Sequence, residues 1–424
     1  MLAAFRYRDF RLFWSGLMIS QVGFWMQTLG HGWLVVQLAM ADGSPELAPL
    51  YLGLVGLSRA LPGLSLSLIA GVIVDRLSRR GLLVTAQATS GLLSAILATL
   101  VVLDAATIWS VLLIGAAGSA AFAFDAPARQ SMVLRIVPSQ DLMSAIGLNA
   151  AAFNGPQIIG PALGGLLIGP LGVAGLFYAS ALGYFAVVAA LLLMRTIPKS
   201  PPSAGSVLDS LKEGLAFMRS DPVVRWVILL AAAAALLARP YVQLFPAVAT
   251  NVLHVGAEEL SWLMTANGCG AFVGALAIAA LGDAVARGRL LLLFTGAVGV
   301  SLTLFSLQSE LPYAMATTLV TGSAVMLFMG LTNTILQTSS PDRLRGRVMS
   351  AYTFIFLGLM PIGQLVLGIL GSFVGVNIAL RIGAVATVLL VAIVYIKGGP
   401  LRRLTSDRRP HMHPHALGVL ASLD

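Results

Sequence analysis

The stretch GVIVDRLSRRGLLV, residues 71–84, joins two long apolar runs and concentrates charge in a chain that otherwise carries little. It places one carboxylate, Asp75, and three guanidinium groups, Arg76, Arg79 and Arg80, close together. Only 10% of the 424 residues are charged and 58% are hydrophobic, whereas a soluble protein carries about 25% charged residues. So few charges do not cover a water-soluble surface, and we therefore expect the chain to lie largely in lipid.

Apolar runs of membrane-spanning length fill most of the sequence, since a helix that crosses a bilayer needs about 20 such residues. Twelve runs are found, at approximately 12–39, 48–74, 82–103, 107–125, 142–168, 172–194, 223–249, 260–281, 289–308, 312–336, 348–371 and 376–396. The sequence therefore predicts an all-α integral membrane protein with 12 transmembrane helices.

Basic residues gather in alternate connections between these runs, and the charged stretch that follows the second run is one of them. The opposite connections hold acidic residues, among them Asp42, Asp104 and Glu310. Because Lys and Arg mark the cytoplasmic side of a membrane protein, the alternation predicts that both termini are cytoplasmic. It also accounts for the net charge of +9 without nucleic acid as a partner.

The longest polar connection, 195–222, divides the runs into six and six. It begins with Pro and Ser and continues with Val207, Leu211, Leu215 and Met218, whose spacing predicts an amphipathic surface helix. The predicted organisation is an N-terminal six-helix bundle at 1–194, a cytoplasmic linker at 195–222, a C-terminal bundle at 223–400 and a disordered cytoplasmic tail at 401–424.

The two predicted bundles carry related loops. The sequence LGDAVARGRLL, residues 281–291, follows the eighth run as the opening stretch follows the second. Asp283 and Arg287 stand 208 residues after Asp75 and Arg79, whereas Gly288 replaces Arg80. Paired halves of this kind are common in secondary transporters.

At these residues the chain resembles the major facilitator superfamily. Gly71 and the charges after it fit the signature of the loop between the second and third helices, with Ser78 in place of the usual glycine. The segment GPALGG, at 160–165, resembles the antiporter motif of exporters, carried here by Gly160, Pro161, Gly164 and Gly165. The sequences at 124–149 and 339–368 are similar to the branch that contains enterobactin exporters, macrolide-efflux proteins and transmembrane secretion effectors.

The resemblance implies two pseudo-symmetric bundles and a cytoplasmic gate at the charged loops. A purely positive anchor would not need Asp75, which we expect to face the positive N-terminal end of the eleventh helix. The arginines beside it would pair with Asp125 at the inner end of the fourth helix. The candidate gate comprises Asp75, Arg76, Arg79, Arg80, Asp125, Asp283 and Arg287, the last two as a secondary latch.

Polar groups inside the apolar runs are the candidates for a substrate cavity, because ionisable groups in lipid are costly and usually functional. These candidates are Gln27, His31, Arg59, Asn154, Arg239, Gln243, Asn333 and Gln364. For each neutral one, hydrogen bonding between helices is an equally good interpretation. His31 and Asp125 are the candidates for proton coupling, since no carboxylate lies at mid-depth of a run.

These features predict a secondary transporter, not an enzyme, in the bacterial cytoplasmic (inner) membrane. We expect export of a small amphiphilic molecule, drug-like or siderophore-like, by alternating access and proton antiport. An importer or uniporter of the same fold is the alternative. The expected partners are the small-molecule substrate, protons and membrane lipid, with a monomeric chain, no cofactor and no metal. Arg59 and Arg239, without a buried acid, favour anionic or neutral cargo over cationic cargo.

Overall fold

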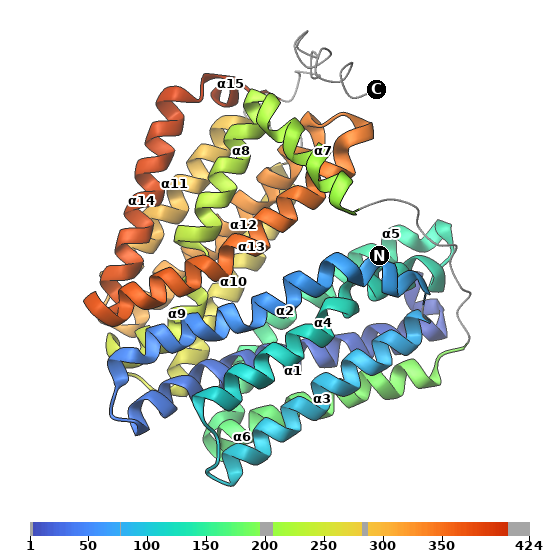
Figure 1. Ribbon diagram of the computed structural model, residues 1–424, viewed down its shortest axis with the longest axis vertical. Coiled ribbons are helices and arrows are strands. Elements are labelled where there is room, and N and C mark those ends of the chain that lie inside the picture. The colour runs from blue at the N-terminus through green and yellow to red at the C-terminus, as the bar shows by residue number, and fades with distance from the viewer. Residues whose placement is uncertain (1–2, 77, 196–206, 282–286, 406–424) are drawn as a thin grey trace. The chain divides into compact units, whose positions relative to one another are not determined.

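Helices account for nearly all of the structure. The computed structural model describes residues 3–76, 78–195, 207–281 and 287–405, and no strand occurs among them (Figure 1). Up to the polar connection, the helices are η1 (Ala3–Arg6), α1 (Arg8–Ala41), η2 (Pro45–Leu47), α2 (Ala48–Arg76), α3 (Arg79–Val102), α4 (Ile108–Ile136), η3 (Ser139–Asp141), α5 (Leu142–Asn154) and α6 (Pro156–Leu193).

After that connection, the helices begin with a short amphipathic element and end with a single turn. They are α7 (Val207–Ser220), α8 (Pro222–Ala233), η4 (Ala234–Ala238), α9 (Tyr241–Asn251), α10 (Ala257–Leu281), α11 (Arg287–Phe305), α12 (Leu311–Ser339), α13 (Asp342–Val374), α14 (Val376–Lys397) and α15 (Gly399–Arg402). The element η4 is π-helical and is followed by a turn at 239–240, so the seventh predicted run is a broken helix made of α8, η4 and α9.

Ten stretches of the described chain are long and apolar enough to cross a membrane. One of them, Leu142–Leu193, is 52 residues long and covers two of the predicted runs. Gly172 interrupts α6 within it, and its φ of 64° is readily adopted only by glycine. The first predicted run lies in α1, which is outside the ten stretches. The all-helical class is confirmed, and the count of twelve crossings stays a prediction.

Contacts group the chain into two compact units. One contains residues 1–204, 242–268 and 364–376, and the other contains 205–241, 269–363 and 377–424. In the first unit α1 and α3 both pack against α6, and α4 packs against α2 and α3 (Figure 1). In the second unit α12 packs against α8 and α11. The predicted bundle boundaries at 194 and 223 stay a prediction.

Small residues bring α1 and α6 into close contact. On the GPALGG segment, a methyl group added to Gly160 would overlap Trp25 and approach the Val22 carbonyl oxygen to 2.9 Å. On the other segment of α6, a methyl group added to Gly23 of α1 would lie 3.0 Å from the Ser180 Cα. Both parts of α6 therefore contact α1 at distances that only glycine permits, as small residues allow in membrane helices.

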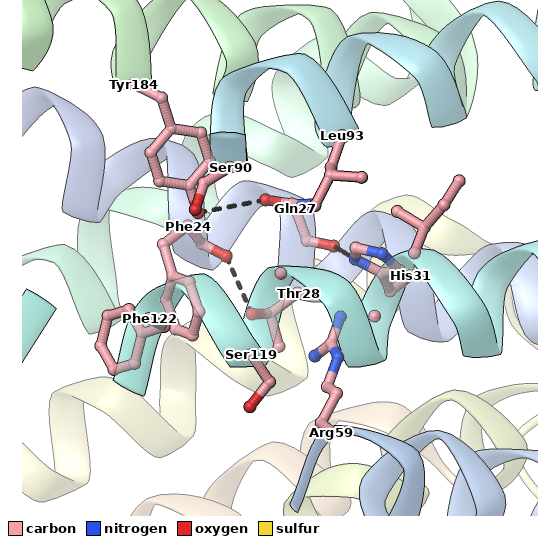
Figure 2. Close-up of a pocket in the computed structure, with 13 residues that line it drawn as sticks. Phe24, Gln27, Thr28, His31, Arg59, Ser90, Leu93, Ser119, Phe122 and Tyr184 are labelled. Atoms are coloured by element: carbon pink, nitrogen blue, oxygen red, sulfur yellow. Dashed lines mark hydrogen bonds between the residues drawn. The ribbon is translucent and has the colours of Figure 1, made fainter. Parts of the chain in front are cut away.

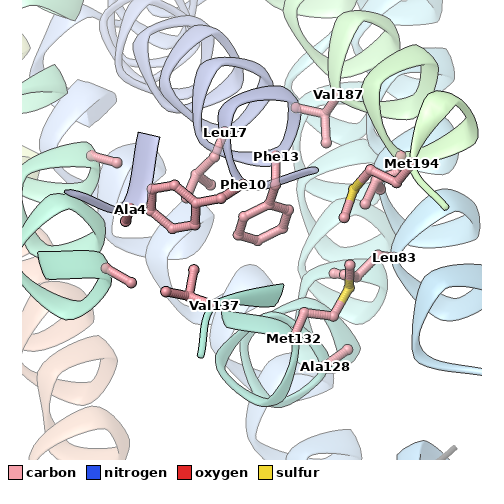
Figure 3. Close-up of a cluster of buried hydrophobic side chains, with 13 residues drawn as sticks. Ala4, Phe10, Phe13, Leu17, Leu83, Ala128, Met132, Val137, Val187 and Met194 are labelled. Atoms are coloured by element: carbon pink, nitrogen blue, oxygen red, sulfur yellow. The ribbon is translucent and has the colours of Figure 1, made fainter. Parts of the chain in front are cut away.

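An apolar core closes one end of the first unit. Phe10, Phe13 and Leu17 of α1 pack there with Leu83 of α3 and Met132 of α4 (Figure 3). The chain start covers this core, because Ala4 in η1 is fully buried.

Hydrogen bonds connect the chain start and α1 to η3 and α5. The Tyr7 hydroxyl donates to the Asp141 carboxylate over 2.8 Å, and the Trp14 indole donates to the Leu148 carbonyl over 2.8 Å. The bond to Asp141 raises the pKa of the Tyr7 phenol above its ordinary value.

The predicted amphipathic helix is present as α7 and belongs to the second unit. Its inner face differs from the prediction, since Gly214 and Met218 are buried while Leu215 is 42% exposed. A side chain at position 214 would collide with the main chain of Arg347 at the start of α13, and Glu213 forms an ion pair with the Arg347 guanidinium. Close backbone contact and ion pairing, as well as apolar periodicity, therefore determine which face of α7 packs inward.

Replacing Gly160 by alanine should destabilise the first unit, because the new methyl group overlaps Trp25. Overpacking of this kind costs about 1–3 kcal/mol, and the apparent unfolding temperature of the purified protein should fall. Gly147→Ala is the matched control, since a methyl group there meets nothing within 4 Å. Equal unfolding temperatures for the two variants would contradict the close packing of α1 on α6.

Candidate functional site

A cavity of about 200 Å³ opens between the helices of the first unit. The helices α1, α2, α3, α4 and α6 all contribute side chains to it (Figure 2). Its lining residues are Phe24, Gln27, Thr28, His31, Arg59, Ser90, Leu93, Ile114, Gly115, Gly118, Ser119, Phe122 and Tyr184. Polar and aromatic groups in one enclosed space are typical of a small-molecule site.

Glycine residues on α4 make room for this cavity. A methyl group added to Gly118 would meet nothing within 4 Å, so this position borders open space. At Gly115 the added carbon would lie 3.3 Å from the Arg59 Nε, which places the Arg59 side chain against the α4 backbone. The rings of Phe24 and Phe122, with centroids 6.2 Å apart and planes inclined by 17°, form an aromatic wall.

Hydrogen bonds fix the α1 wall of the cavity. The Ser180 and Tyr184 hydroxyls donate to the Gln27 side-chain oxygen over 3.1 and 3.3 Å. The His31 Nδ1 lies 2.9 Å from the Gln27 main-chain oxygen, and it carries the proton because a carbonyl only accepts. The His31 ring is also packed edge-on against Phe177 at 4.9 Å. These contacts orient the polar face of α1 before any ligand arrives.

Among the described residues that line the cavity, Arg59 is the only charged one. It is half-buried and extends from α2 toward the part of the cavity lined by Thr28 and His31 (Figure 2). Among the described residues, none accepts a hydrogen bond from its guanidinium group or forms an ion pair with it. Arg381 is different, because its guanidinium donates to the Ser306 carbonyl over 3.2 Å.

Asp125 forms a separate, buried cluster farther along α4. Its carboxylate lies 2.8 Å from the Arg129 guanidinium, and both side chains are at most 5% exposed. The Gln87 side chain of α3 donates to the same carboxylate over 2.7 Å. The Arg129 guanidinium stacks 4.3 Å from the ring centre of Phe153 on α5. The cluster therefore joins α3, α4 and α5 through one buried charge pair.

The first charged loop is described only in part. The side chains of Asp75, Arg76 and Arg79 lie outside what the structure describes, so the gate that they were predicted to form stays a prediction. Arg80 donates to the Leu192 and Met194 carbonyls at the end of α6, over 2.6 and 3.1 Å. The described contacts of Arg80 therefore satisfy main-chain carbonyls at the C-terminal end of a helix, where a positive charge is favourable.

The second loop makes the corresponding connection without an arginine. Asp283 lies outside the described residues, and Arg287 begins α11. Gly288, which takes the place of Arg80, donates its N–H to the Leu404 carbonyl over 3.4 Å. The Leu401 carbonyl lies so close to Gly288 that any side chain there would overlap it. Leu401 is fully buried in α15, and α15 packs against α11 and α8. The disordered tail predicted for 401–424 stays a prediction, and its residues 406–424 lie outside the described residues.

Arg239 lies next to an irregular backbone segment. The preceding residues form the π-helical η4, and the Arg239 N–H donates to the Ala234 carbonyl over 2.7 Å. Its Nε atom is buried without a hydrogen-bond partner in the described part of the chain. The hydroxyl of Tyr352, in the same unit, is also buried and unpaired among the described residues. Short π-helical segments occur frequently at functional sites.

The cavity contains three of the eight predicted substrate residues, Gln27, His31 and Arg59. The other neutral candidates lie elsewhere: Asn154 and Asn333 donate to carbonyls of their own helices over 2.9 and 3.1 Å. Gln243 is half-buried on α9, and Gln364 is buried on α13. These five residues, Arg239 included, are absent from the described lining of this cavity.

Sequence reasoning missed most of the lining, above all Tyr184 and the α4 segment. Tyr184 stands in an apolar run that gives no signal. On α4, the small residues Gly115, Gly118 and Ser119 share one side of the helix and were a usable sign of open space.

A family model for transmembrane secretion effectors matches residues 1–423. The chain belongs to this family of the major facilitator superfamily, and it is a multi-pass protein of the bacterial inner membrane. The multidrug efflux pump Tap of Mycolicibacterium fortuitum is 27% identical over 89% of this chain and 92% of its own. An enterobactin exporter of Escherichia coli is 27% identical over 75% of this chain and 77% of its own.

Solved structures of transporters share the fold. The nucleoside transporter NupG matches with a TM-score of 0.71 at 14% identity, covering 92% of this chain and 99% of its own. A D-xylose–proton symporter matches with a TM-score of 0.70 at 13% identity, covering 91% of this chain and 97% of its own. At such identities the likeness concerns the fold alone.

Removing one partner of the Asp125–Arg129 pair should destabilise the protein, because it leaves a buried charge unpaired. Breaking such a pair costs roughly 3–5 kcal/mol. Asp125→Asn and Arg129→Gln should each lower the apparent unfolding temperature of the purified protein, and the double variant should lose less than the sum. Additive losses would show that Asp125 depends on other partners, as the predicted gate requires.

The Gly288→Ala substitution should displace the segment after α14, because its methyl group overlaps the Leu401 carbonyl. Trypsin should then cleave after Arg402 and Arg403 several times faster than in the wild-type protein. Gly296→Ala, on the same helix, is the control, since its methyl group meets only Val391 at 3.8 Å. An unchanged cleavage rate for Gly288→Ala would refute the packing of this segment.

Proposed function

We propose that the chain is a secondary exporter that moves a small amphiphilic molecule out of the cytoplasm by alternating access. The observation that carries the proposal is the full-length family match, whose relatives include a multidrug efflux pump and a siderophore exporter. The cavity of the first unit supports it, since polar groups there are held in place beside an aromatic wall. Such a site suits a molecule with one polar and one apolar end.

In this mechanism residues 1–194 and 223–400 rock against each other, and the charged loops close the cytoplasmic side. Asp75 and the arginines beside it act as the inner gate. Proton antiport drives the cycle, with His31 and Asp125 as the candidate carriers. His31 is the better placed of the two, because it lines the cavity, whereas Asp125 is committed to Arg129 and Gln87. No enzymatic step is required.

Transport in inside-out vesicles tests the proposal. Acidifying the vesicle lumen should drive accumulation of a fluorescent amphiphile, and Asp75→Asn should slow it at least about tenfold, a barrier change of about 1.4 kcal/mol. Asp42→Asn is the matched control, because Asp42 is an exposed acid that directly follows the last residue of α1.

Two outcomes would contradict this account. Wild-type rates in the Asp75→Asn vesicles would remove Asp75 from the gate. Absence of gradient-driven accumulation across a panel of anionic, neutral and cationic amphiphiles would overturn proton-driven export.

A further inference from the structure

Arg59 places a charge deep in the first unit, and no described residue compensates it. It stands eleven residues after the first residue of α2, about 16 Å along the helix at 1.5 Å per residue. A charge at this depth is costly unless it meets a partner or faces a water-filled cavity. Within the described part of the chain, the guanidinium group has the cavity but no hydrogen-bond acceptor or carboxylate.

The surrounding groups do not supply the missing negative charge. None of the described residues that line the cavity is acidic. The buried acid on the same wall helix, Asp125, is already paired with Arg129 at 2.8 Å. The Gln27 side-chain oxygen accepts from Ser180 and Tyr184. A ligand that carries its own acidic oxygens would therefore complete the site.

The apolar part of the cavity indicates what accompanies that acidic group. Phe24, Phe122, Leu93 and Ile114 provide aromatic and aliphatic surface, and Gly118 leaves space beside them. The cavity volume of about 200 Å³ is far larger than the volume of an inorganic anion, and it suits a ring system with one acidic substituent.

We propose that this cavity is an aryl-anion site, in which Arg59 binds a carboxylate, sulfonate or phenolate while the attached ring packs against Phe24 and Phe122. This inference rests on the proposed function, because it identifies the cavity as the place where exported cargo binds. A cation is disfavoured there, since it would face Arg59 without an acid to offset the repulsion.

Equilibrium binding to the purified protein in lipid nanodiscs tests the charge preference. Three probes share one ring and differ in charge: 2-naphthoate, 2-naphthamide and 2-naphthylmethylammonium. A hydrogen-bonded charge pair contributes about 1.5–3 kcal/mol, so naphthoate should bind roughly ten- to a hundredfold more tightly than naphthamide. The ammonium probe should bind most weakly, and acetate should compete poorly because it lacks the ring.

Three variants locate the effect. Arg59→Gln should abolish the preference for naphthoate over naphthamide, while Arg59→Lys should retain part of it. Gly118→Leu should weaken the binding of both naphthoate and naphthamide, because the leucine side chain fills the cavity while its Cβ atom meets no neighbour. Arg381→Gln is the control: it also removes a half-buried arginine, but one bonded to Ser306 just after α11, and it should leave the preference unchanged.

The results separate this inference from the exporter proposal. Equal binding of naphthoate and naphthamide to the wild-type protein would overturn the aryl-anion site, and this comparison needs no variant to fold. A preference that survives Arg59→Gln would also overturn it. A preference that depends on Arg59, in a protein that shows no gradient-driven transport, would uphold the site and contradict export.

Discussion

The cost of a charge in a low-dielectric interior governs how this chain places its ionisable side chains. Asp125 and Arg129 meet that cost by pairing with each other at 2.8 Å, with Gln87 and Phe153 completing their surroundings. Arg59 meets it differently, by lining a cavity. The charge pair on α4 and Arg59 on α2 lie on neighbouring helices of one unit. The pair has a structural role, whereas Arg59 is available to a ligand.

The two loops that repeat at an interval of 208 residues connect their helices to a neighbouring helix end by different contacts. Arg80 and Gly288 occupy corresponding positions at the start of α3 and α11. The first connects its helix to the end of α6 through guanidinium hydrogen bonds. The second lets the residues after α14 approach until the Leu401 carbonyl contacts it. Glycine at 288 is therefore a requirement of close packing, and it explains why the second copy of the loop lacks the arginine.

Sequence predicted the helical class from hydropathy and the family from the motifs at 71–84 and 160–165. It also named three residues that line the cavity, because ionisable and polar groups stand out within apolar runs. It did not name Arg129, four residues from Asp125 on the same helix, as a partner of that carboxylate. It also missed Tyr184, whose role depends on α6 lying beside α1. That arrangement is set by Gly23, Gly160 and the turn at Gly172, and glycine positions alone do not indicate which helix approaches.

The paired cluster and the cavity share two helices, α3 and α4. On α3, Gln87 holds Asp125 and Ser90, one turn away, lines the cavity. On α4, Phe122 lines the cavity and Asp125 follows one turn later. The buried pair and one wall of the cavity are therefore built from the same packed segments of α3 and α4. Arg129 also contacts Phe153 on α5, and α5 ends at Asn154, directly before Gly155 and the helix that carries the GPALGG motif.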